Sequence, residues 1–264
     1  NHAEVLRIYP QVLPEHVEIV GPVQFDLYKN SRYLWSETKW RQKVNLPENR
    51  PVILYASGID GIIAHEDSIL MDMDRAITAG QIPQNPMILL RLHPVDSRER
   101  WQSLLSRTKN LVLDDNFNLT TVPDKNKYRG IVKYTRYTDE DIARQVSTLK
   151  YTQAHISVSS TMAIDGAIFD KPQINPAYNG LAQHARCLQE LYQREHYLPI
   201  TRSGAIEIVY NREQTVTAIA NALVNPQQNA AQRWKMIEDV CTFTDGQCAQ
   251  RLSNALHRFL GEKI

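Results

Sequence analysis

The chain has 264 residues, of which 42% are hydrophobic, so it can bury the core of one large α/β domain or two small ones. Thirty basic and 29 acidic side chains leave a formal net charge of +1, which excludes a global field that would attract nucleic acid or an anionic membrane. Any anion site must therefore be local.

The three cysteines are an odd number without C-x-x-C spacing, which argues against a disulfide framework and against a structural zinc site. A reducing cytoplasm is therefore expected. No stretch approaches the roughly 18 consecutive apolar residues of a membrane span, and the first residues lack a basic-then-apolar signal pattern. The chain begins at Asn1 rather than at a methionine, and we expect it to be part of a longer protein.

Short apolar runs alternate with amphipathic segments along most of the chain. The first half predicts a strand at 51–56, a helix at 66–79, a strand at 87–92, a helix capped by Ser97, and a strand at 111–113. The second half predicts irregular loops at 114–135, a helix from Thr138 to Leu149, a strand at 154–158, a helix through Phe169, strands at 172–175 and 206–209, and a helical tail at 212–262 that is broken near 225 and 245.

This alternation predicts an α/β fold, a Rossmann-like doubly wound parallel sheet with a helical C-terminal tail. We place a lead-in from a preceding domain at 1–48, the sheet domain at 49–211, and C-terminal helices that pack on it at 212–264. Ligands of such sheets bind outside the carboxyl ends of the strands, where the strand order reverses. Polar residues at those strand ends are therefore the first candidates for a site.

Arg91-Leu92-His93-Pro94 closes the strand at 87–92. The alternation of side chains along a strand puts Arg91 and His93 on the same side, at the edge where ligands bind. The alternative is structural: the His93 ring would fill space at the strand end, and Arg91 would form a surface ion pair.

Ser159-Ser160-Thr161 turns directly from a strand into a helix. Hydroxyl groups and unpaired backbone N–H groups at a positive helix end favour phosphate, although the same turn can be a helix cap alone. Asp165, one turn further on the face of Thr161, is positioned to accept hydrogen bonds from a ribose. Ser57-Gly58, after the first strand, would let a ligand approach the backbone.

Acidic residues between Asp60 and Asp74 raise the question of a metal site, but their spacing does not form a calcium loop. We interpret them as the solvated face of an amphipathic helix. Asp114-Asp115 is a weaker magnesium alternative. His184 and His196 flank an amphipathic segment; His196 is a candidate for shaping a loop near the ligand, with packing as the favoured role.

Several short motifs stand in a characteristic order: Gly21-Pro22-Val23-Gln24-Phe25-Asp26, the strand and loop at 52–58, Arg91-Leu92-His93-Pro94, and residues 159–166 followed by Ile168-Phe169-Asp170-Lys171-Pro172. Together they resemble the carboxy-terminal half of GT-B glycosyltransferases. The similarity is closest to bacterial surface-polysaccharide enzymes and to CDP-glycerol glycerophosphotransferases. Asp245-Gly246-Gln247-Cys248 with Arg251 also resembles an Asp-Gly segment near the end of those chains.

The resemblance implies two Rossmann-like domains that face each other across a cleft, the carboxy-terminal one holding the donor nucleotide. It implies that His93 and Pro94 lie beside the nucleotide or its phosphates, as in enzymes with cytidine-nucleotide donors, and that residues 159–161 bind phosphate. Asp165 stands where many GT-B enzymes carry a ribose-binding glutamate. An acceptor domain usually precedes this one and often supplies the catalytic base; since there is no room for it before Ile19, we expect it to be missing from the sequence.

The implied activity is transfer of a sugar or polyol phosphate from a CMP-, CDP- or UDP-linked donor to a polysaccharide or lipid-linked acceptor. Arg91 and His93 would be the catalytic groups that stabilise the leaving nucleotide, with no cofactor and no essential metal. We expect no nucleic-acid partner, a cytoplasmic location, and peripheral association of the full-length enzyme with the inner face of the membrane. The alternatives are a nucleotide-sugar epimerase of GT-B architecture and a noncatalytic binding module.

Overall fold

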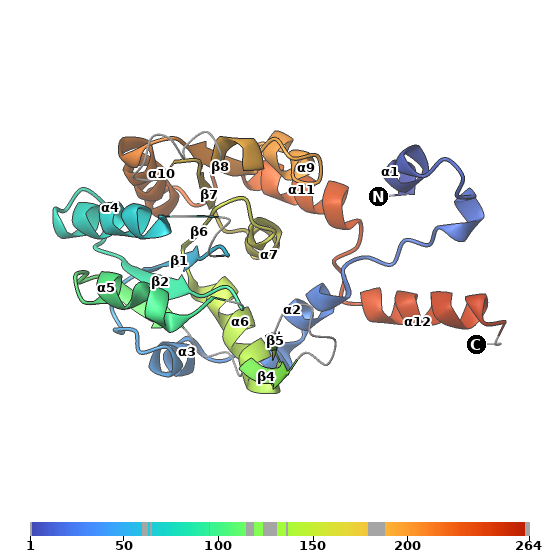
Figure 1. Ribbon diagram of the computed structural model, residues 1–264, viewed down its shortest axis with the longest axis horizontal. Helices are drawn as coiled ribbons and strands as arrows, with labels where there is room; N and C mark the ends of the chain where they lie inside the picture. The colour runs from blue at the N-terminus through green and yellow to red at the C-terminus, as the bar shows by residue number, and fades with distance from the viewer. Residues whose placement is uncertain are drawn as a thin grey trace.

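A six-stranded parallel sheet forms the centre of the molecule, with strand order β3-β2-β1-β6-β7-β8 (Figure 1). The computed structural model describes residues 2–59, 63, 65–94, 96–114, 119–123, 131–135, 137–178 and 188–261. The strands are β1 (Val52–Ala56), β2 (Met87–Arg91), β3 (Leu111–Asp114), β6 (Ala154–Ser157), β7 (Gln173–Pro176) and β8 (Ile206–Val209). The order reverses between β1 and β6, so the predicted Rossmann-like sheet is confirmed and its switch point lies between these two strands.

Helices cover both faces of the sheet. One buried cluster joins the strands to α4 (Glu66–Thr78), α5 (Gln102–Leu105) and α10 (Arg212–Val224). The other face carries α3 (Glu37–Lys43), α6 (Asp139–Tyr151), α7 (Met162–Ile168), α9 (Leu198–Arg202) and α11 (Ala230–Cys241). Because both faces are covered, β1 and β2 are buried along their whole length, which explains their continuous apolar sequence.

The predicted boundaries of most elements agree with the structure, with two corrections. The segment 114–135 was expected to be irregular, but it contains an antiparallel pair, β4 (Leu119–Pro123) and β5 (Ile131–Thr135). Both strands are rich in β-branched residues, which favour extended structure. Ser97 precedes a short 3-10 helix, η4 (Arg98–Trp101), but its side chain forms no cap; its backbone N–H donates to Asp96 Oδ1 at 2.9 Å.

Two motifs that are far apart in sequence pack together near the chain ends. The lead-in contains α1 (His2–Ile8), η1 (Pro14–His16), η2 (Val23–Phe25), α2 (Asp26–Lys29) and η3 (Ser31–Tyr33). The Asp26 carboxylate accepts hydrogen bonds from the backbone N–H groups of Cys248 and Ala249, at 3.0 and 2.7 Å, and so caps the first turn of α12 (Cys248–Phe259). Gly21 has φ +80°, and a Cβ atom there would lie 2.6 Å from Cys248 Sγ, so only glycine fits.

The helical tail predicted from the sequence is confirmed. Helices α10 and α11 pack on the sheet domain, whereas α12 extends away from it beside the N-terminal segment (Figure 1). None of the described helices has the length and apolar character needed to cross a membrane.

Candidate functional site

Two adjoining cavities open at the carboxyl ends of β1, β2 and β6, beside the switch point. The Tyr137 cavity, of about 200 Å³, receives polar groups from Arg91, Tyr137 and Gln145. The Arg194 cavity, of about 260 Å³, receives them from Arg194 and His196. The two cavities share the residues Ser57, His93, Ser160 and Thr161. Among the described residues no carboxylate lines either cavity, so a ligand here meets cationic and neutral groups.

The cavities bring together most of the residues singled out from the sequence. Those that line one or both cavities are Ser57, Gly58, Arg91, His93, Pro94, Ser159, Ser160 and Thr161. Asp165 lines neither cavity. The strand ends and the turn before α7 therefore meet at one place, as the parallel sheet predicts.

Ser57 ties the loop after β1 to the loop after β2. Its hydroxyl accepts a hydrogen bond from the backbone N–H of His93 at 3.0 Å and donates one to buried Asp96 at 3.2 Å. Asp96 also accepts bonds from Trp101 Nε1 at 2.9 Å and from Arg100 at 3.0 Å. The Ser57 hydroxyl is thus engaged within the protein, and its effect is to position His93.

Gly58 is engaged in a similar way. Its backbone N–H donates to both carboxylate oxygens of Glu66, each at 3.0 Å, and Glu66 also accepts bonds from Tyr55 and Arg100. Glu66 is 0% exposed, and this burial raises its pKa to about 7. Asp74 is buried too and accepts the backbone N–H groups at 109 and 110.

The interpretation of the acidic residues in α4 as a solvated face was therefore wrong for Glu66 and Asp74. Both carboxylates lie inside, where they satisfy backbone N–H groups that a loop would otherwise leave unpaired. Asp60, the first residue of that acidic run, lies outside the described residues.

Arg91 belongs to a buried charge cluster. One oxygen of Asp114 lies 3.3 Å from the Arg91 guanidinium, and the other lies 3.1 Å from Arg144 of α6. The strand register places Arg91 directly beside Asp114. Two guanidinium groups thus share one carboxylate beside the Tyr137 cavity, and the charge of Arg91 also acts on buried Asp165. The ion pair of Arg91 is a buried one, in contrast to the surface pair considered above.

Asp114 itself is occupied by these arginines, and Asp115 lies outside the described residues. In the part of the chain that the structure describes, no three His, Cys, Asp or Glu side chains are grouped so that they could hold a metal ion. Titration of the nucleotide with and without magnesium tests whether its binding requires a metal.

His93 lies at the boundary between the two cavities and is half-buried. Its burial lowers the pKa of the imidazole below the usual value, while the charge of Asp96 acts in the opposite direction. In the unliganded protein near pH 7 the ring is therefore mostly neutral. A phosphate group beside it would favour the protonated form.

The turn before α7 is held in place from behind. Ser159 adopts φ +44°; its N–H donates to the Tyr192 hydroxyl at 3.2 Å, and its own hydroxyl donates to Leu191 O at 3.3 Å. Ser160 Oγ accepts the N–H of Met162 at 3.2 Å, a local contact that holds the turn before α7, whose N-cap residue Thr161 makes no side-chain cap. Ser160 and the exposed Thr161 line both cavities.

Asp165 is hydrogen-bonded to Tyr28, a residue of the lead-in. The Tyr28 hydroxyl of α2 donates a hydrogen bond to Asp165 and accepts one from Gln145 Nε2 at 3.1 Å. Burial raises the pKa of Asp165, and the hydrogen bond from Tyr28 opposes this effect. Since Gln145 lines the Tyr137 cavity, the carboxylate lies one side chain behind the cavity wall.

A sequence model of the family described as CDP-glycerol:poly(glycerophosphate) glycerophosphotransferase matches residues 15–258. The chain belongs to this family. No curated protein matches it.

Solved structures show the same fold as this member of the glycerophosphotransferase family. A variant of the wall teichoic acid polymerase TagF soaked with CDPG is 18% identical, with a TM-score of 0.60, covering 97% of this chain and 53% of that one. The complex of S. aureus MnaA with UDP is 14% identical, with a TM-score of 0.59, covering 98% and 57%. A putative UDP-N-acetylglucosamine 2-epimerase from Listeria monocytogenes is 12% identical, with a TM-score of 0.57, covering 100% and 58%.

These similarities confirm the expected resemblance to the GT-B and glycerophosphotransferase group. At these identities the structural likeness shows the fold alone. The chain spans about half the length of the structures that it matches, 53% in the case of TagF.

Sequence reasoning missed two residues of the candidate site, Tyr137 and Tyr28. Tyr137 had a signal, because it precedes the Thr138 and Asp141 capping box, which places the start of α6 at the carboxyl edge of the sheet. Tyr28 had none, because it lies 137 positions from Asp165 and meets it only through tertiary packing.

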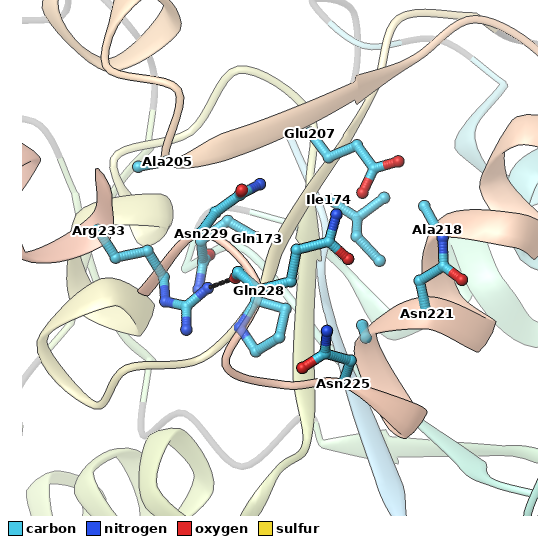
Figure 2. Close-up of a pocket in the computed structure, with 12 residues that line it drawn as sticks. Gln173, Ile174, Ala205, Glu207, Ala218, Asn221, Asn225, Gln228, Asn229 and Arg233 are labelled. Atoms are coloured by element: carbon cyan, nitrogen blue, oxygen red, sulfur yellow. Dashed lines mark hydrogen bonds between the residues drawn. The ribbon is translucent and has the colours of Figure 1, made fainter. Parts of the chain in front are cut away.

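A third cavity lies at the amino ends of β7 and β8, away from the switch point (Figure 2). Side-chain amides such as those of Gln173 and Asn225 surround it, and buried Arg233 donates to Gln228 O at 2.7 Å and pairs with Asp170. Its volume of about 20 Å³ fits about one water molecule. It is too small for a nucleotide.

Proposed function

We propose that this chain binds the nucleotide of an activated donor, in an enzyme that transfers a polyol phosphate or a sugar to a surface polymer. The observation that carries the proposal is the junction of two cavities at His93 and Thr161, beside the switch point, with cationic groups and no described carboxylate in its lining. Membership of the glycerophosphotransferase family supports a cytidine diphosphate donor. The polymerase soaked with CDPG has the same fold and supports the same choice.

In this proposal the nucleoside lies in the Tyr137 cavity. Tyr137 is 47% exposed and offers an aromatic face for the base, and Gln145 offers an amide. Asp165 lies behind Gln145 and Tyr28, close enough to act on a ribose through that hydrogen-bonded pair. The two phosphates lie at the junction of the cavities, beside His93, Ser160 and Thr161.

The transfer of a polyol phosphate follows from this placement. An acceptor hydroxyl oxygen attacks the phosphorus of the transferred phosphate; the bond from that phosphorus to the bridging oxygen breaks, and CMP leaves with the electron pair. Negative charge develops on the leaving phosphate, where Arg91, held by Asp114, and His93 supply positive charge and hydrogen-bond donors. We assign the base that accepts the hydroxyl proton to an acceptor domain outside this chain.

We also propose that the acceptor is a polysaccharide or a lipid-linked polymer. The enzyme would act in the cytoplasm, at the inner face of the membrane, and would need no metal. The epimerase alternative shares the fold, whereas the family model that matches is that of a glycerophosphotransferase. An epimerase would invert a nucleotide-linked sugar without transferring it, and NMR of the donor distinguishes the two reactions.

Calorimetric titration with CMP, CDP, UDP and GDP, with and without magnesium, tests the proposal. We expect CDP to bind and Ser160→Ala to weaken binding about tenfold, as for the loss of one hydrogen bond to a charged group. Asp165→Ala should weaken binding by less, because Asp165 lines neither cavity and acts through Tyr28 and Gln145. Arg107→Gln is the control, because this exposed arginine follows α5 at the opposite edge of the sheet and donates to Ser103 O.

Failure of the folded chain to bind any of the four nucleotides would contradict the proposal and favour the noncatalytic module. Binding that requires magnesium would contradict the metal-independent part alone. Melting curves of each variant separate lost binding from lost folding.

A further inference from the structure

The Arg194 cavity has a lining that the donor nucleotide does not use. Beyond the junction with the Tyr137 cavity it is bounded by the apolar side chains of Ile59, Ile63, Val158 and Leu191. Arg194 and His196 add charged and polar groups at its rim, where both are exposed. An apolar pocket with two convergent cationic or imidazole groups is suited to a small organic ligand that carries an anion.

The backbone around these two residues is fixed by buried tyrosines on either side. Tyr192, which is 2% exposed, accepts the N–H of Ser159 at 3.2 Å and donates to Pro176 O at 2.7 Å. Tyr197, which is 1% exposed, donates to Ser160 O at 3.1 Å. Both tyrosines therefore fasten the segment 192–197 to the turn that begins α7, and the residues between them are held beside that turn.

The charges of this segment point to an anionic ligand. Glu195, the nearest carboxylate in sequence, pairs with Arg7 at 3.4 Å, outside the cavity lining. Within the described residues, no hydrogen bond or ion pair engages the guanidinium of Arg194, so its planar set of donors is available to a phosphate. The imidazole of His196 offers one N–H donor even when it is neutral.

In-line transfer relates this cavity to the reaction. The attacking and leaving oxygens lie on opposite sides of the phosphorus. If the nucleoside occupies the Tyr137 cavity and the phosphates lie at the junction, the attacking oxygen of the acceptor approaches from the side of the Arg194 cavity, which also has room beside the junction for the transferred unit. Its volume of about 260 Å³ accommodates a unit of the size of glycerol phosphate.

We propose that Arg194 and His196 bind a phosphate group, either the one on the transferred unit or the one on the terminal unit of the acceptor. This assignment rests on the proposed function of the chain as a donor-binding domain. If the phosphate is that of the acceptor, the two residues determine specificity for a phosphorylated polymer over a neutral one.

The test uses calorimetric titration of the chain and its variants Arg194→Gln, Arg194→Lys and His196→Gln, with Arg107→Gln as the matched loss of charge outside the cavity. The ligands are CMP, CDP and CDP-glycerol, followed by glycerol 3-phosphate and glycerol in the presence of saturating CDP. We expect Arg194→Gln to weaken one phosphate ligand about tenfold or more, and Arg194→Lys to retain part of that affinity.

The ligands separate the two sources of the phosphate. Weaker binding of CDP and CDP-glycerol with unchanged binding of CMP assigns Arg194 to the transferred unit. Weaker binding of glycerol 3-phosphate alone assigns it to the acceptor. Equal affinities of the native chain and Arg194→Gln for all phosphate ligands overturn the inference, whereas failure of the native chain to bind CMP and CDP overturns the proposed function instead.

Discussion

The affinity for a nucleotide-activated donor is expected to rise as the pH falls from 8 to 6, and His93→Ala should abolish this rise. Burial holds the pKa of His93 below its usual value in the free protein. A pyrophosphate beside the ring favours the protonated form and raises the pKa in the complex, by about one unit or more for an adjacent opposite charge. One unit corresponds to about 1.4 kcal/mol, so the full gain in affinity is about tenfold, and only part of it develops between pH 8 and 6.

The direction follows from the order of the two pKa values. Above the pKa of the complex the ring is neutral in both states and contributes little. Affinity increases as the pH falls through the pKa of the complex, and it becomes constant below the lower pKa of the free protein. The backbone N–H of His93, not its ring, bonds to Ser57, so His93→Ala keeps the loop attached.

Calorimetric titration of CDP-glycerol at pH 8, 7 and 6 measures this effect. Each phosphate of that ligand carries one ester and one anhydride bond, so neither has an ionisation between pH 6 and 8. Two buffers with different ionisation enthalpies report the proton taken up on binding. His16→Ala, at an exposed position of η1, is the control. The same pH dependence in the native chain and in His93→Ala, or binding without proton uptake, would refute the reasoning.

Two further predictions concern the framework of the site. Thr138→Ala removes the capping box with Asp141 and should lower the free energy of unfolding by about 1 kcal/mol, which lowers the melting temperature by about 2–4 °C for a chain of this size. Thr138→Ser is the control. Unchanged melting of the alanine variant would disprove the contribution of the cap. Asp114→Ala leaves Arg91 and Arg144 without their shared carboxylate and should cost about 3–5 kcal/mol, measured by urea unfolding; a loss below about 1 kcal/mol would contradict it.

The sheet was predictable because its signals are local. Apolar runs such as 87–90 end at polar or turn residues, and helices such as α6 begin at a recognisable cap. Parallel strands then bring their carboxyl ends to one edge, so Arg91, His93 and the turn at 159–161 come together without further information. The pair β4 and β5 escaped prediction because its β-branched residues lie within a polar segment that shows no strict alternation.

The contacts behind the site depend on tertiary packing that the sequence does not display. Asp26 caps a helix that begins 222 positions later, and Tyr28, two residues further on, reaches Asp165. Helical periodicity could not show that Glu66 is buried, because it is the first residue of α4 and turns toward the loop at Gly58. The domain boundaries and the ribose contact of Asp165 stay predictions.

The arrangement of charge explains how a chain with a net charge of +1 can form a local anion site. Three buried carboxylates near the cavities are each held within the protein: Glu66 by Gly58 and Arg100, Asp96 by Trp101, and Asp114 by two arginines. These acids accept hydrogen bonds from loop N–H groups and from guanidinium groups. They therefore orient those hydrogen-bond donors without facing the ligand. Among the described residues, the polar groups that line the cavities are therefore cationic or neutral, and neutralising any one of these buried acids should disturb the position of the phosphate-binding groups before it changes their charge.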